Sequence, residues 1–524
     1  MKYLYLGISS KFIHTMPAGW FLAEFLNRHG IKVKELYHNV NEKYADVLDN
    51  VLREEFDTLL ISVYIFNVDF VRKLIKDIKL RMPRCTVIAG GPEVSEDFEA
   101  DHIIIGEGEK ALYGFLTKGG RKVIREENIA DLDTIPTPYT GERLSKSVDK
   151  LIYYESSRGC PFKCSYCMAG LTGGVRYFSI ERVKEDLLKI ASSGAKVVKF
   201  TDRTFNANVK RTDEILQFIR ENFSGRDICF HFEVGGDLFR ESTMKILEEL
   251  PVGLVQMEAG VQTLNEESLK AVNRVFDKEK FIDNISRIRA FGNIHIHLDL
   301  IAGLPHETRE SFIKSFNQVY LLRPHMLQLG FLKFLKGTPI RENYAAEYCD
   351  NAPYEVISTP TMSEDDLKEL KSMEWAFDRL YNSGRFRHTL DYLLNFNDNP
   401  YQMFLEISRH LERRGIMRGC QQLDLISGIL SFHDDEKVKE FLRFDYLLTN
   451  RSRSSPACLR NQHTPEFRRF LSIQPNTSTV LFEEFTFLPD RLNKGHYIVK
   501  FDYSKRNSVS RAYGCEIMKA NYST

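Results

Sequence analysis

The stretch SRGCPFKCSYC, residues 157–167, holds three cysteines in a C-x3-C-x2-C array. Three thiolates this close in sequence can face one ligand only if the backbone wraps around it, and Gly159 and Pro161 suit such a turn. The array directly follows the strand-like LIYYESS, residues 151–157. Loops at the carboxyl ends of barrel strands are where barrel enzymes keep their chemistry. The stretch therefore predicts a metal or cluster site at the end of a barrel strand.

A structural zinc site is the main alternative for these cysteines. Zinc in such sites takes four protein ligands with characteristic paired spacing. No second C-x2-C or H-x3-H follows the array in this sequence. Three cysteines on an iron–sulfur cubane, in contrast, leave one iron open to chelate an amine and a carboxylate. The pattern thus favours a cluster over zinc.

Strand-like and helix-like patterns alternate over most of the chain, which is typical of parallel βαβ units. Residues 1–120 predict a doubly wound, Rossmann-like parallel sheet, and the turn-rich residues 121–150 predict a linker. Residues 151–340 contain six strand–helix repeats, which fit a partial (β/α)6 barrel better than a complete eightfold one. Residues 341–524 first look helical and then strand-like, so we expect a mixed α+β domain. The predicted fold class is α/β with this third domain appended.

The composition is that of an ordinary globular protein, with 43% hydrophobic and 27% charged residues. Lys+Arg and Asp+Glu both number 72, so no overall field attracts nucleic acid or an anionic membrane. No apolar run is long enough to cross a bilayer, and the N-terminus does not have the pattern of a signal peptide. We therefore expect a cytoplasmic protein with no membrane partner. The six cysteines outside the array are expected to be small hydrophobic residues rather than disulfide partners.

The cysteine array resembles the signature of radical S-adenosylmethionine enzymes, including an aromatic residue, Tyr166, just before the last cysteine. Strand-end motifs further along the chain agree with this family. The resemblance implies that Cys160, Cys164 and Cys167 hold a 4Fe–4S cluster. In the coproporphyrinogen-dehydrogenase-like branch, strand-end residues bind S-adenosylmethionine. The resemblance therefore implies a binding set of Tyr166, Thr201, Asp202, Glu233, Gln262, Arg274 and Asp299.

One departure from the family pattern affects this set. The Gly-Gly-Glu motif of the second barrel strand is replaced here by Thr201-Asp202-Arg203. In the family that motif meets the methionine amino group. The contact to the amine is therefore the least defined part of the predicted site.

A metallohydrolase site is a rival interpretation of His295, His297 and Asp299. Residues two apart on a strand share one face, so these three side chains could line up as metal ligands. Amidohydrolases carry such a pair on the first barrel strand, with further ligands that have no counterpart here. The flanking DLIAGLP, residues 299–305, resembles the radical family instead. We expect the two histidines to be core or pocket residues.

Residues 1–120 resemble the cobalamin-binding domain that precedes the barrel in class B radical methyltransferases and in anaerobic Mg-protoporphyrin cyclase-like enzymes. Loops at the carboxyl ends of parallel strands bind ligands. Those loops contain the predicted cobalamin contacts, Ser62, Tyr64, Gly90, Gly91, Gly106, Glu107 and Gly108. His14 lies in the loop where other cobalamin domains offer a cobalt ligand, but Phe12 and Pro17 replace the Asp and Gly of that motif. The resemblance therefore implies cobalamin bound without a histidine on the cobalt.

The resemblance implies reductive cleavage of S-adenosylmethionine, hydrogen abstraction from a substrate that is a small molecule or of unknown kind, and methyl transfer from cobalamin. An external electron donor such as flavodoxin or ferredoxin is an expected partner. A radical oxidoreductase or cyclase without net methylation is one alternative. An RNA-modifying or non-catalytic binding protein is another, and the five arginines of residues 451–470 keep a nucleic-acid partner open. The C-terminal domain resembles an uncharacterised domain often fused to such proteins.

Overall fold

The structure is a computed structural model that describes residues 1–474 and 477–519. It divides into two compact units, whose boundary passes through strand β12 and helix α10. The first unit consists of Met1–Glu258, Leu269–Asn284 and Phe331–Ile357, and the second of Ala259–Ser268, Ile285–Gly330 and Ser358–Thr524. None of the helices in the described part of the chain has the length and apolar character that spanning a bilayer requires.

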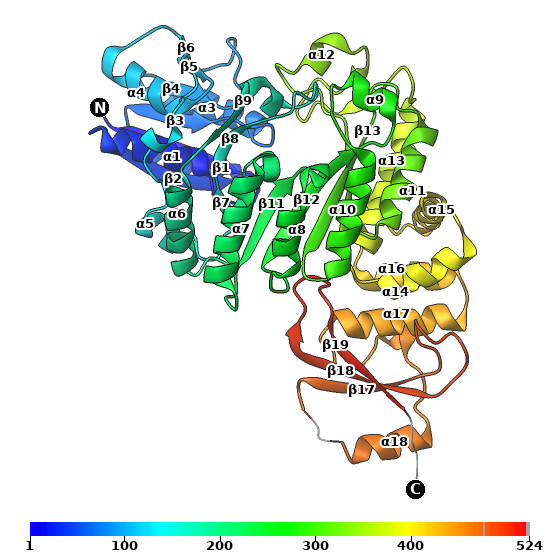
Figure 1. The fold of residues 1–524 in the computed structure, drawn as a ribbon. Helices are drawn as coiled ribbons and strands as arrows, with labels where there is room; N and C mark the ends of the chain where they lie inside the picture. The colour runs from blue at the N-terminus through cyan, green and yellow to red at the C-terminus, as the bar shows by residue number, and fades with distance from the viewer. Residues whose placement is uncertain (475–476, 520–524) are drawn as a thin grey trace. The chain divides into compact units, whose positions relative to one another are not determined.

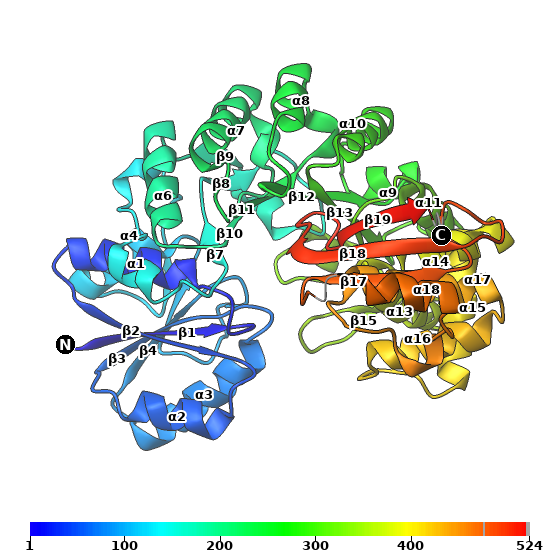
Figure 2. The ribbon, with the colours of Figure 1, turned by 90° about the horizontal axis from the view of Figure 1, so that it is seen from below.

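The N-terminal region is a six-stranded parallel sheet in the order β2-β1-β3-β4-β5-β6. Its strands are β1 (Tyr3–Ser9), β2 (Val33–Asn39), β3 (Thr58–Ser62), β4 (Thr86–Gly90), β5 (His102–Ile105) and β6 (Val123–Arg125). Helices α1 (Pro17–Arg28) and α4 (Gly108–Lys118) cover one face, and α2 (Tyr44–Leu52) and α3 (Val68–Arg81) cover the other (Figure 2). The predicted doubly wound sheet is confirmed.

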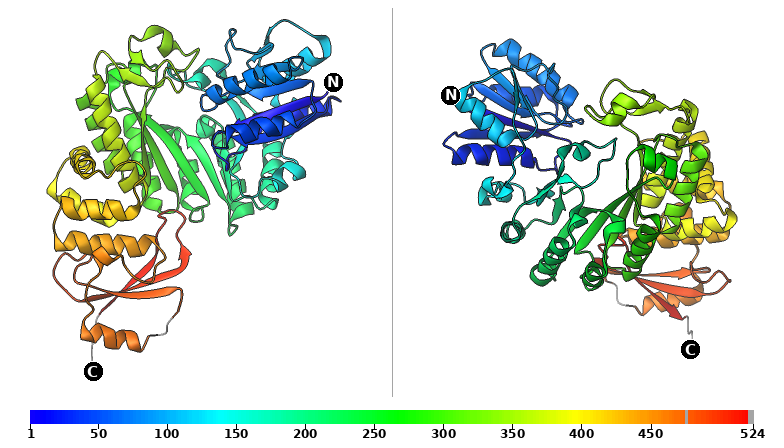
Figure 3. Two further views of the ribbon diagram at one scale, coloured as in Figure 1. Left: turned by 180° about the vertical axis from the view of Figure 1, so that it is seen from behind. Right: turned by 45° about the horizontal axis from the view of Figure 1, so that its top comes forward.

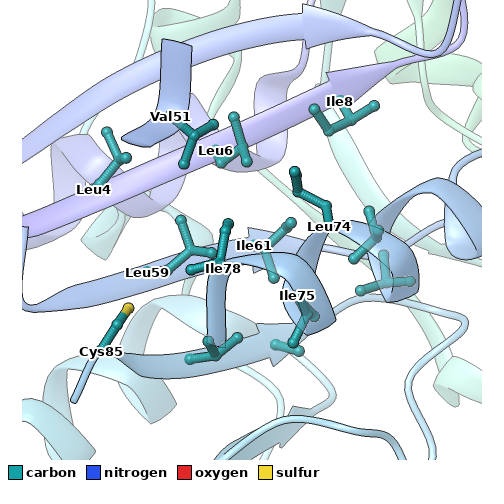
Figure 4. Close-up of a cluster of buried hydrophobic side chains, with 14 of the residues drawn as sticks. Leu4, Leu6, Ile8, Val51, Leu59, Ile61, Leu74, Ile75, Ile78 and Cys85 are labelled. Carbon is teal, nitrogen blue, oxygen red and sulfur yellow. The ribbon is translucent and has the colours of Figure 1, made fainter. Parts of the chain in front are cut away.

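Successive side chains of a strand point to opposite faces of the sheet. Because helices cover both faces here, the side chains on both faces are buried. Leu4, Leu6 and Ile8 of β1 pack against Leu74 and other aliphatic residues of α3 (Figure 4). Tyr5, between them in sequence, belongs instead to the core under α1 and α4. Strands buried on both faces, with continuous apolar runs, are the mark of a parallel sheet covered by helices.

The second six-stranded sheet has the order β14-β13-β12-β11-β10-β7, as expected for the partial barrel. Its strands are β7 (Ile152–Tyr154), β10 (Val197–Phe200), β11 (Cys229–Val234), β12 (Val255–Gln262), β13 (His295–Ala302) and β14 (Met326–Phe331). Within the first unit, α6 (Ile180–Ser192), α7 (Val209–Phe223) and α8 (Glu241–Glu248) lie along the outer face (Figure 1). Phe223 of α7 packs on Phe230 of β11 with ring centroids 5.1 Å apart.

A two-stranded antiparallel hairpin, β8 (Ser157–Cys160) and β9 (Gly174–Tyr177), frames the cysteine loop. Gly159 on β8 has a φ of +99°, and a Cβ there would lie 1.9 Å from the carbonyl oxygen of Gly174. Only glycine permits both that backbone conformation and that approach. The hairpin thus depends on Gly159, which the sequence had marked only as a turn residue.

The remaining elements connect the sheets and build the C-terminal domain. They are α5 (Gly141–Ser145), α9 (Glu266–Ala271), α10 (Lys278–Phe291), α11 (Arg309–Leu321), α12 (Pro339–Asn343), β15 (Glu347–Tyr348), β16 (Val356–Ser358), α13 (Glu364–Phe377), α14 (Arg387–Leu393), α15 (Pro400–Arg413), α16 (Gln422–Phe432), α17 (Glu436–Thr449), α18 (Pro465–Ser472), β17 (Val480–Phe485), β18 (Tyr497–Arg506) and β19 (Tyr513–Lys519).

The C-terminal domain combines helices with a small antiparallel sheet in the order β17-β18-β19. Helix α17 lies beside this sheet (Figure 3), and Phe444 and Leu447 of the helix pack on Phe485 and Phe501 of the strands. The predicted mixed α+β character is confirmed.

Candidate functional site

The three cysteines of the array lie on one loop that the rest of the first unit holds in place. Cys160 ends β8, while Cys164 and Cys167 follow on the loop before a short 3-10 turn. All three are free thiols; Cys164 is buried and the other two are half-buried. The N–H of Ser165 donates to the carbonyl of Val272 (2.9 Å), so a distant segment anchors the loop.

Arg274 provides positive charge beside this loop. Its Nη1 lies 3.8 Å from the Sγ of Cys164. Burial opposes the charge of the guanidinium, but the neighbouring Tyr166 and Cys164 outweigh it, so the pKa of Arg274 is raised. Burial also raises the pKa of the Cys167 thiol. Near neutral pH, binding of a metal ion to the sulfur would favour loss of its proton. A donor set of three thiols next to a fixed cation fits an iron–sulfur cluster.

Asp202 faces away from open space and holds the strand that leads into the cysteine loop. Its carboxylate accepts hydrogen bonds from the N–H and Oγ of Ser156 (3.0 and 2.5 Å) and from the Oγ of Ser157 (2.5 Å). The residue is only 2% exposed, and burial raises its pKa despite these bonds. Its oxygens are therefore occupied, which does not suit the direct S-adenosylmethionine contact expected from the sequence. Thr201 lines a cavity instead.

A row of polar side chains crosses the inner face of the barrel sheet in the first unit. Lys199 of β10 lies in register with Tyr153 of β7 on one side and with His231 of β11 on the other. The Nζ of Lys199 is 3.1 Å from the Oε2 of Glu258 and 3.8 Å from the Oε1 of Glu233. His231 Nε2 lies 3.1 Å from the same Oε2 of Glu258. Interleaved residues such as Phe200 and Phe232 are fully buried toward the helices. The interior of this sheet is thus polar.

Glu233, a predicted S-adenosylmethionine ligand, belongs to this row. Its two oxygens lie 3.8 Å from Lys199 Nζ and 3.7 Å from Arg203 Nη1. Its side chain keeps 26% of its surface exposed. It therefore remains accessible to a further cation such as an amino group.

The other two predicted ligands lie in the second unit. Gln262 ends β12 with a φ of +70°, and Asp299 on β13 has its Oδ1 3.0 Å from Nε2 of His297. His295 turns its ring onto His325, with centroids 4.9 Å apart, and its Nδ1–H donates to the carbonyl of Val509 (3.1 Å). His297 and Asp299 therefore form a pair, while His295 contacts the C-terminal segment.

A cavity of about 1160 Å³ opens at the carboxyl ends of the N-terminal strands. This volume exceeds the roughly 300–1,000 Å³ of ordinary ligand pockets, so it suits a large ligand. Every predicted cobalamin contact lines it, namely Ser62, Tyr64, Gly90, Gly91, Gly106, Glu107 and Gly108. Gly159 of the cysteine hairpin and Thr201 and Arg203 of the barrel line it as well. One cavity therefore borders both the N-terminal loops and the cysteine loop.

The glycines of the cavity do not all have the role that the sequence suggested. At Gly91 (φ +113°) a Cβ would lie 2.5 Å from the carbonyl oxygen of Val63, so this glycine is required by its own backbone. At Gly108 a Cβ would press on Leu22 at 2.9 Å. Gly106, with its φ of +99°, has a single heavy atom within 4 Å of its would-be Cβ, an oxygen of Glu126 at 3.9 Å. The interpretation that ligand approach explains every glycine is therefore corrected for Gly91.

His14 also lines the cavity, but its ring already has a partner. Its Nδ1 and the hydroxyl of Tyr153 share a hydrogen bond of 2.6 Å. Burial, followed by Lys11 and Lys199, lowers the pKa of this imidazole, so the ring is neutral at pH 7. The geometry is consistent with a histidine that belongs to the barrel mouth rather than to a cobalt ligand loop.

Five charged residues that the sequence did not connect form a network at the cavity wall. Arg158, next to the cysteine loop, donates to Glu109 (2.6 Å) and Glu155 (3.0 Å) and lies 3.6 Å from Glu107. Arg176, opposite Arg158 across the hairpin, also binds Glu107. All five side chains line the cavity.

Glu107 is thus the centre of a clamp between the N-terminal domain and the hairpin. Its Oε2 also accepts the N–H of Ile129 (2.8 Å). Burial opposes its charge, but Arg176, Ile129 and Arg158 together hold its pKa below the usual range. The predicted role of Glu107 as a cobalamin contact competes with these bonds. The stretch IGEGE, residues 105–109, was the signal available in the sequence. The arginines that bind its two glutamates lie far away along the chain.

We expect Arg158→Ala to destabilise the protein strongly. The change leaves Glu109 and Glu155 partly buried without their cation, and breaking such pairs costs about 3–5 kcal/mol. Arg125→Ala is the control, since Arg125 pairs with Glu96 on the surface, with 53% and 67% of the two side chains exposed. An exposed pair contributes about 0–1 kcal/mol. Thermal unfolding followed by circular dichroism distinguishes the two, and equal midpoints would show that the network does not stabilise the fold.

Comparison with known families places three domains along the chain. Residues 4–116 match the B12 binding domain, and residues 154–319 match the Radical SAM superfamily. Residues 342–512 match DUF4080, a family described as protein of unknown function. The Radical SAM match covers the segment that includes His295 and His297, which favours the radical SAM interpretation of this segment over the metallohydrolase one.

Curated relatives match only part of the chain. An uncharacterized methyltransferase, PH0819, from Pyrococcus horikoshii is 29% identical over 296 residues, which is 50% of this chain and 62% of the relative. Hopanoid C-3 methylase from Methylococcus capsulatus is 27% identical over 342 residues, 57% of this chain and 63% of the relative. The chain thus spans less than two thirds of the length of either relative.

The fold is similar to that of a solved radical S-adenosylmethionine methyltransferase, TsrM from Kitasatospora setae, whose structure contains cobalamin and a 4Fe–4S cluster. The TM-score is 0.54 with 16% sequence identity, and the match covers 67% of this chain and 76% of that one. The family matches imply a 4Fe–4S cluster, S-adenosylmethionine and cobalamin as cofactors. The thiol donor set and the large cavity fit these groups. The chain thus contains a B12-binding domain, a radical SAM domain and a DUF4080 domain, in that order.

Proposed function

We propose that this protein is a cobalamin-dependent radical SAM methyltransferase acting on a small molecule. The observation that supports it is the single cavity bordered by the loops of the B12-binding domain and by the hairpin of Cys160. A methyl carrier in those loops and a radical source at the cysteine loop would then face one enclosed space. The similarity to methyltransferases agrees with this arrangement.

The residues of the chain would have distinct roles in this reaction. Cys160, Cys164 and Cys167 would hold the cluster, which supplies the electron that cleaves S-adenosylmethionine, while cobalamin carries the methyl group. Arg274 would bind the methionine carboxylate, since a guanidinium pairs with a carboxylate through two parallel hydrogen bonds. For Gln262 and Asp299, which belong to the second unit, a contact to the adenosine part of S-adenosylmethionine stays a prediction. The walls of the cavity would exclude water from the radical.

Glu233 would bind the methionine amine in place of the missing Gly-Gly-Glu carboxylate. It keeps exposed surface, whereas the oxygens of Asp202 are taken by Ser156 and Ser157. Thr201 at the cavity edge would add a hydroxyl contact. The electron would come from an external donor such as flavodoxin or ferredoxin.

Isotope transfer tests the proposal directly. The reconstituted protein is incubated anaerobically with cobalamin, a reductant and S-adenosylmethionine whose methyl group is deuterated, together with an extract of the cells that make it. Methyl transfer would give a product that carries the deuterated methyl group, along with 5′-deoxyadenosine. Products that have only lost hydrogen, with the label confined to methionine, would instead support the radical oxidoreductase or cyclase interpretation and contradict methyl transfer.

We expect Arg274→Ala to weaken S-adenosylmethionine binding by about 1.5–3 kcal/mol, the scale of a charge-assisted hydrogen bond. That corresponds to roughly 10- to 150-fold in Kd by calorimetry. Arg226→Ala is the matched control, because Arg226 is exposed and the contact described for its guanidinium is with the ring of Phe223, outside the cavity lining. Iron content must stay equal in both variants, since Arg274 lies beside Cys164. Unchanged affinity with a full cluster would remove Arg274 from the binding set.

A further inference from the structure

Arg203 follows β10, and its cationic side chain lines the cavity. Its side chain is 58% exposed and lines the cavity together with Thr201 and Gly159. The ion pair described for it is with Glu233, at 3.7 Å, beyond normal hydrogen-bond length. Arg203 thus has a loosely held guanidinium in the space between the N-terminal loops and the cysteine loop.

The charges around Glu233 change when S-adenosylmethionine binds as proposed above. In the chain alone, Lys199 and Arg203 are balanced by Glu233 and Glu258. The amino group of S-adenosylmethionine, bound to Glu233, would neutralise part of the negative charge of that carboxylate. Lys199 keeps Glu258, only 3.1 Å away, but Arg203 has no second carboxylate among the ion pairs described for it. Arg203 also acts electrostatically on Cys167, but the bound cofactor would weaken the carboxylate contact described for it and leave its guanidinium facing the cavity.

We propose that Arg203 binds an oxyanion of the substrate, a carboxylate or a phosphate, while S-adenosylmethionine occupies Glu233. This inference rests on the proposed function and adds the chemical class of the substrate to it. The planar fork of a guanidinium matches both kinds of oxyanion through two hydrogen bonds, and Lys cannot reproduce that geometry. A wholly hydrocarbon substrate would take the guanidinium of Arg203 out of water without giving it a hydrogen-bond partner, which is costly.

Lys199 serves a different purpose in this arrangement. It is flanked in register by Tyr153 and His231, and burial opposes its charge while Glu258 and Glu233 more than restore it, so its pKa is raised. It therefore stays protonated and bound to the wall of the barrel. Lys199 holds Glu258 and Glu233 in place, and Arg203 is the group left to meet the substrate.

The experiment measures which small molecules the holoprotein retains. Protein loaded with cluster and cobalamin is saturated with S-adenosylhomocysteine, which offers the same amine and carboxylate but is not cleaved. It is equilibrated with a small-molecule extract of the cells that make it, and retained compounds are identified by mass spectrometry after ultrafiltration. Two further extracts are used, one with its carboxylates converted to neutral amides and one treated with phosphatase.

We expect the wild type to retain at least one oxyanion compound, lost in the amidated extract if it is a carboxylate and in the phosphatase-treated extract if it is a phosphate. Arg203→Gln should lower its retention about tenfold or more, the equivalent of about 1.4 kcal/mol. Retention by Arg203→Lys should lie between that of the wild type and that of Arg203→Gln, because lysine keeps the positive charge but cannot make two parallel hydrogen bonds. Arg226→Gln, at an exposed site in the loop that follows α7, should retain it as the wild type does.

Four outcomes would overturn the inference. Retention unaffected by Arg203→Gln would show that another group binds the substrate, and retention of uncharged compounds alone would contradict the oxyanion. Weaker S-adenosylhomocysteine binding by Arg203→Gln would place Arg203 on the cofactor instead. A wild type that takes up neither cobalamin nor S-adenosylhomocysteine is recognised before any extract is added, and it would overturn the proposed function and this inference together.

Discussion

Replacing any one of Cys160, Cys164 and Cys167 with alanine is expected to abolish the iron–sulfur cluster and all cleavage of S-adenosylmethionine. Each thiolate would bind one iron, and a site with two protein ligands cannot retain a cubane through purification. The wild type reconstituted anaerobically should contain about four irons per chain, as one 4Fe–4S cluster requires. Iron analysis, visible absorbance and the yield of 5′-deoxyadenosine measure the effect. Air should bleach the wild type, since the open iron has no thiolate to shield it.

Cys229→Ala is the control for this experiment. Cys229 lies on β11 in the same unit, half-buried, and burial raises the pKa of its thiol to about 11. It should keep iron, colour and cleavage unchanged. A full cluster in any of the three loop variants, or about eight irons in the wild type, would contradict the single-cluster assignment.

Ala18→Trp is expected to prevent cobalamin binding while leaving S-adenosylmethionine cleavage intact. Ala18 is the second residue of α1, half-buried, and lines the cavity. An indole there fills space that a corrin needs, and a close-packed wall cannot yield enough to admit both. Ala18 is a cleaner choice than Gly91, where any side chain would strike the backbone of Val63. Cobalt content and the visible spectrum after anaerobic loading with hydroxocobalamin measure the loss.

Arg28→Trp adds the same indole at the exposed end of the same helix, outside the cavity lining. It should bind cobalamin stoichiometrically. His14→Ala should also keep the spectrum of the wild type, because the Nδ1 of this ring already shares a hydrogen bond with Tyr153. Full cobalt in Ala18→Trp would show that the corrin lies elsewhere, and a spectral change in His14→Ala would restore a histidine ligand.

Periodicity and motif spacing sufficed for the α/β fold class because parallel strands buried on both faces leave long β-branched runs in the sequence. The hairpin of Ser157–Cys160 and Gly174–Tyr177 was not foreseen. Its strands are short, contain glycine, and pair across the very loop that the cysteines occupy. Local patterns do not reveal such pairing, since neither strand has an apolar face of its own.

Asp202 shows how a strand-end carboxylate can mislead. In the sequence it looks equivalent to Glu233, because both are acidic residues at the carboxyl end of a parallel strand. The register of β10 with β7 pairs Phe200 with Tyr154, so two residues later Asp202 comes beside Ser156. The serine pair at 156–157 was a usable signal once that register was known. The network of Glu107 and Arg158 had no such signal, because its members come from separate segments whose approach is decided by tertiary packing.

The clamp of Glu107, Glu109 and Arg158 also determines how this protein can be divided or recombined. A fragment that ends after α4 would keep Glu107 and Glu109 but lose Arg158 and Arg176. The complementary fragment would carry Arg176 without its carboxylate, and Arg158 with Glu155 as its remaining partner. Neither piece would satisfy its own charges. A chimera that takes its corrin-binding half from a relative would meet the same mismatch unless β8 and β9 were transferred with it. The recombinable module therefore extends through Tyr177, beyond the border that domain families draw between residues 116 and 154.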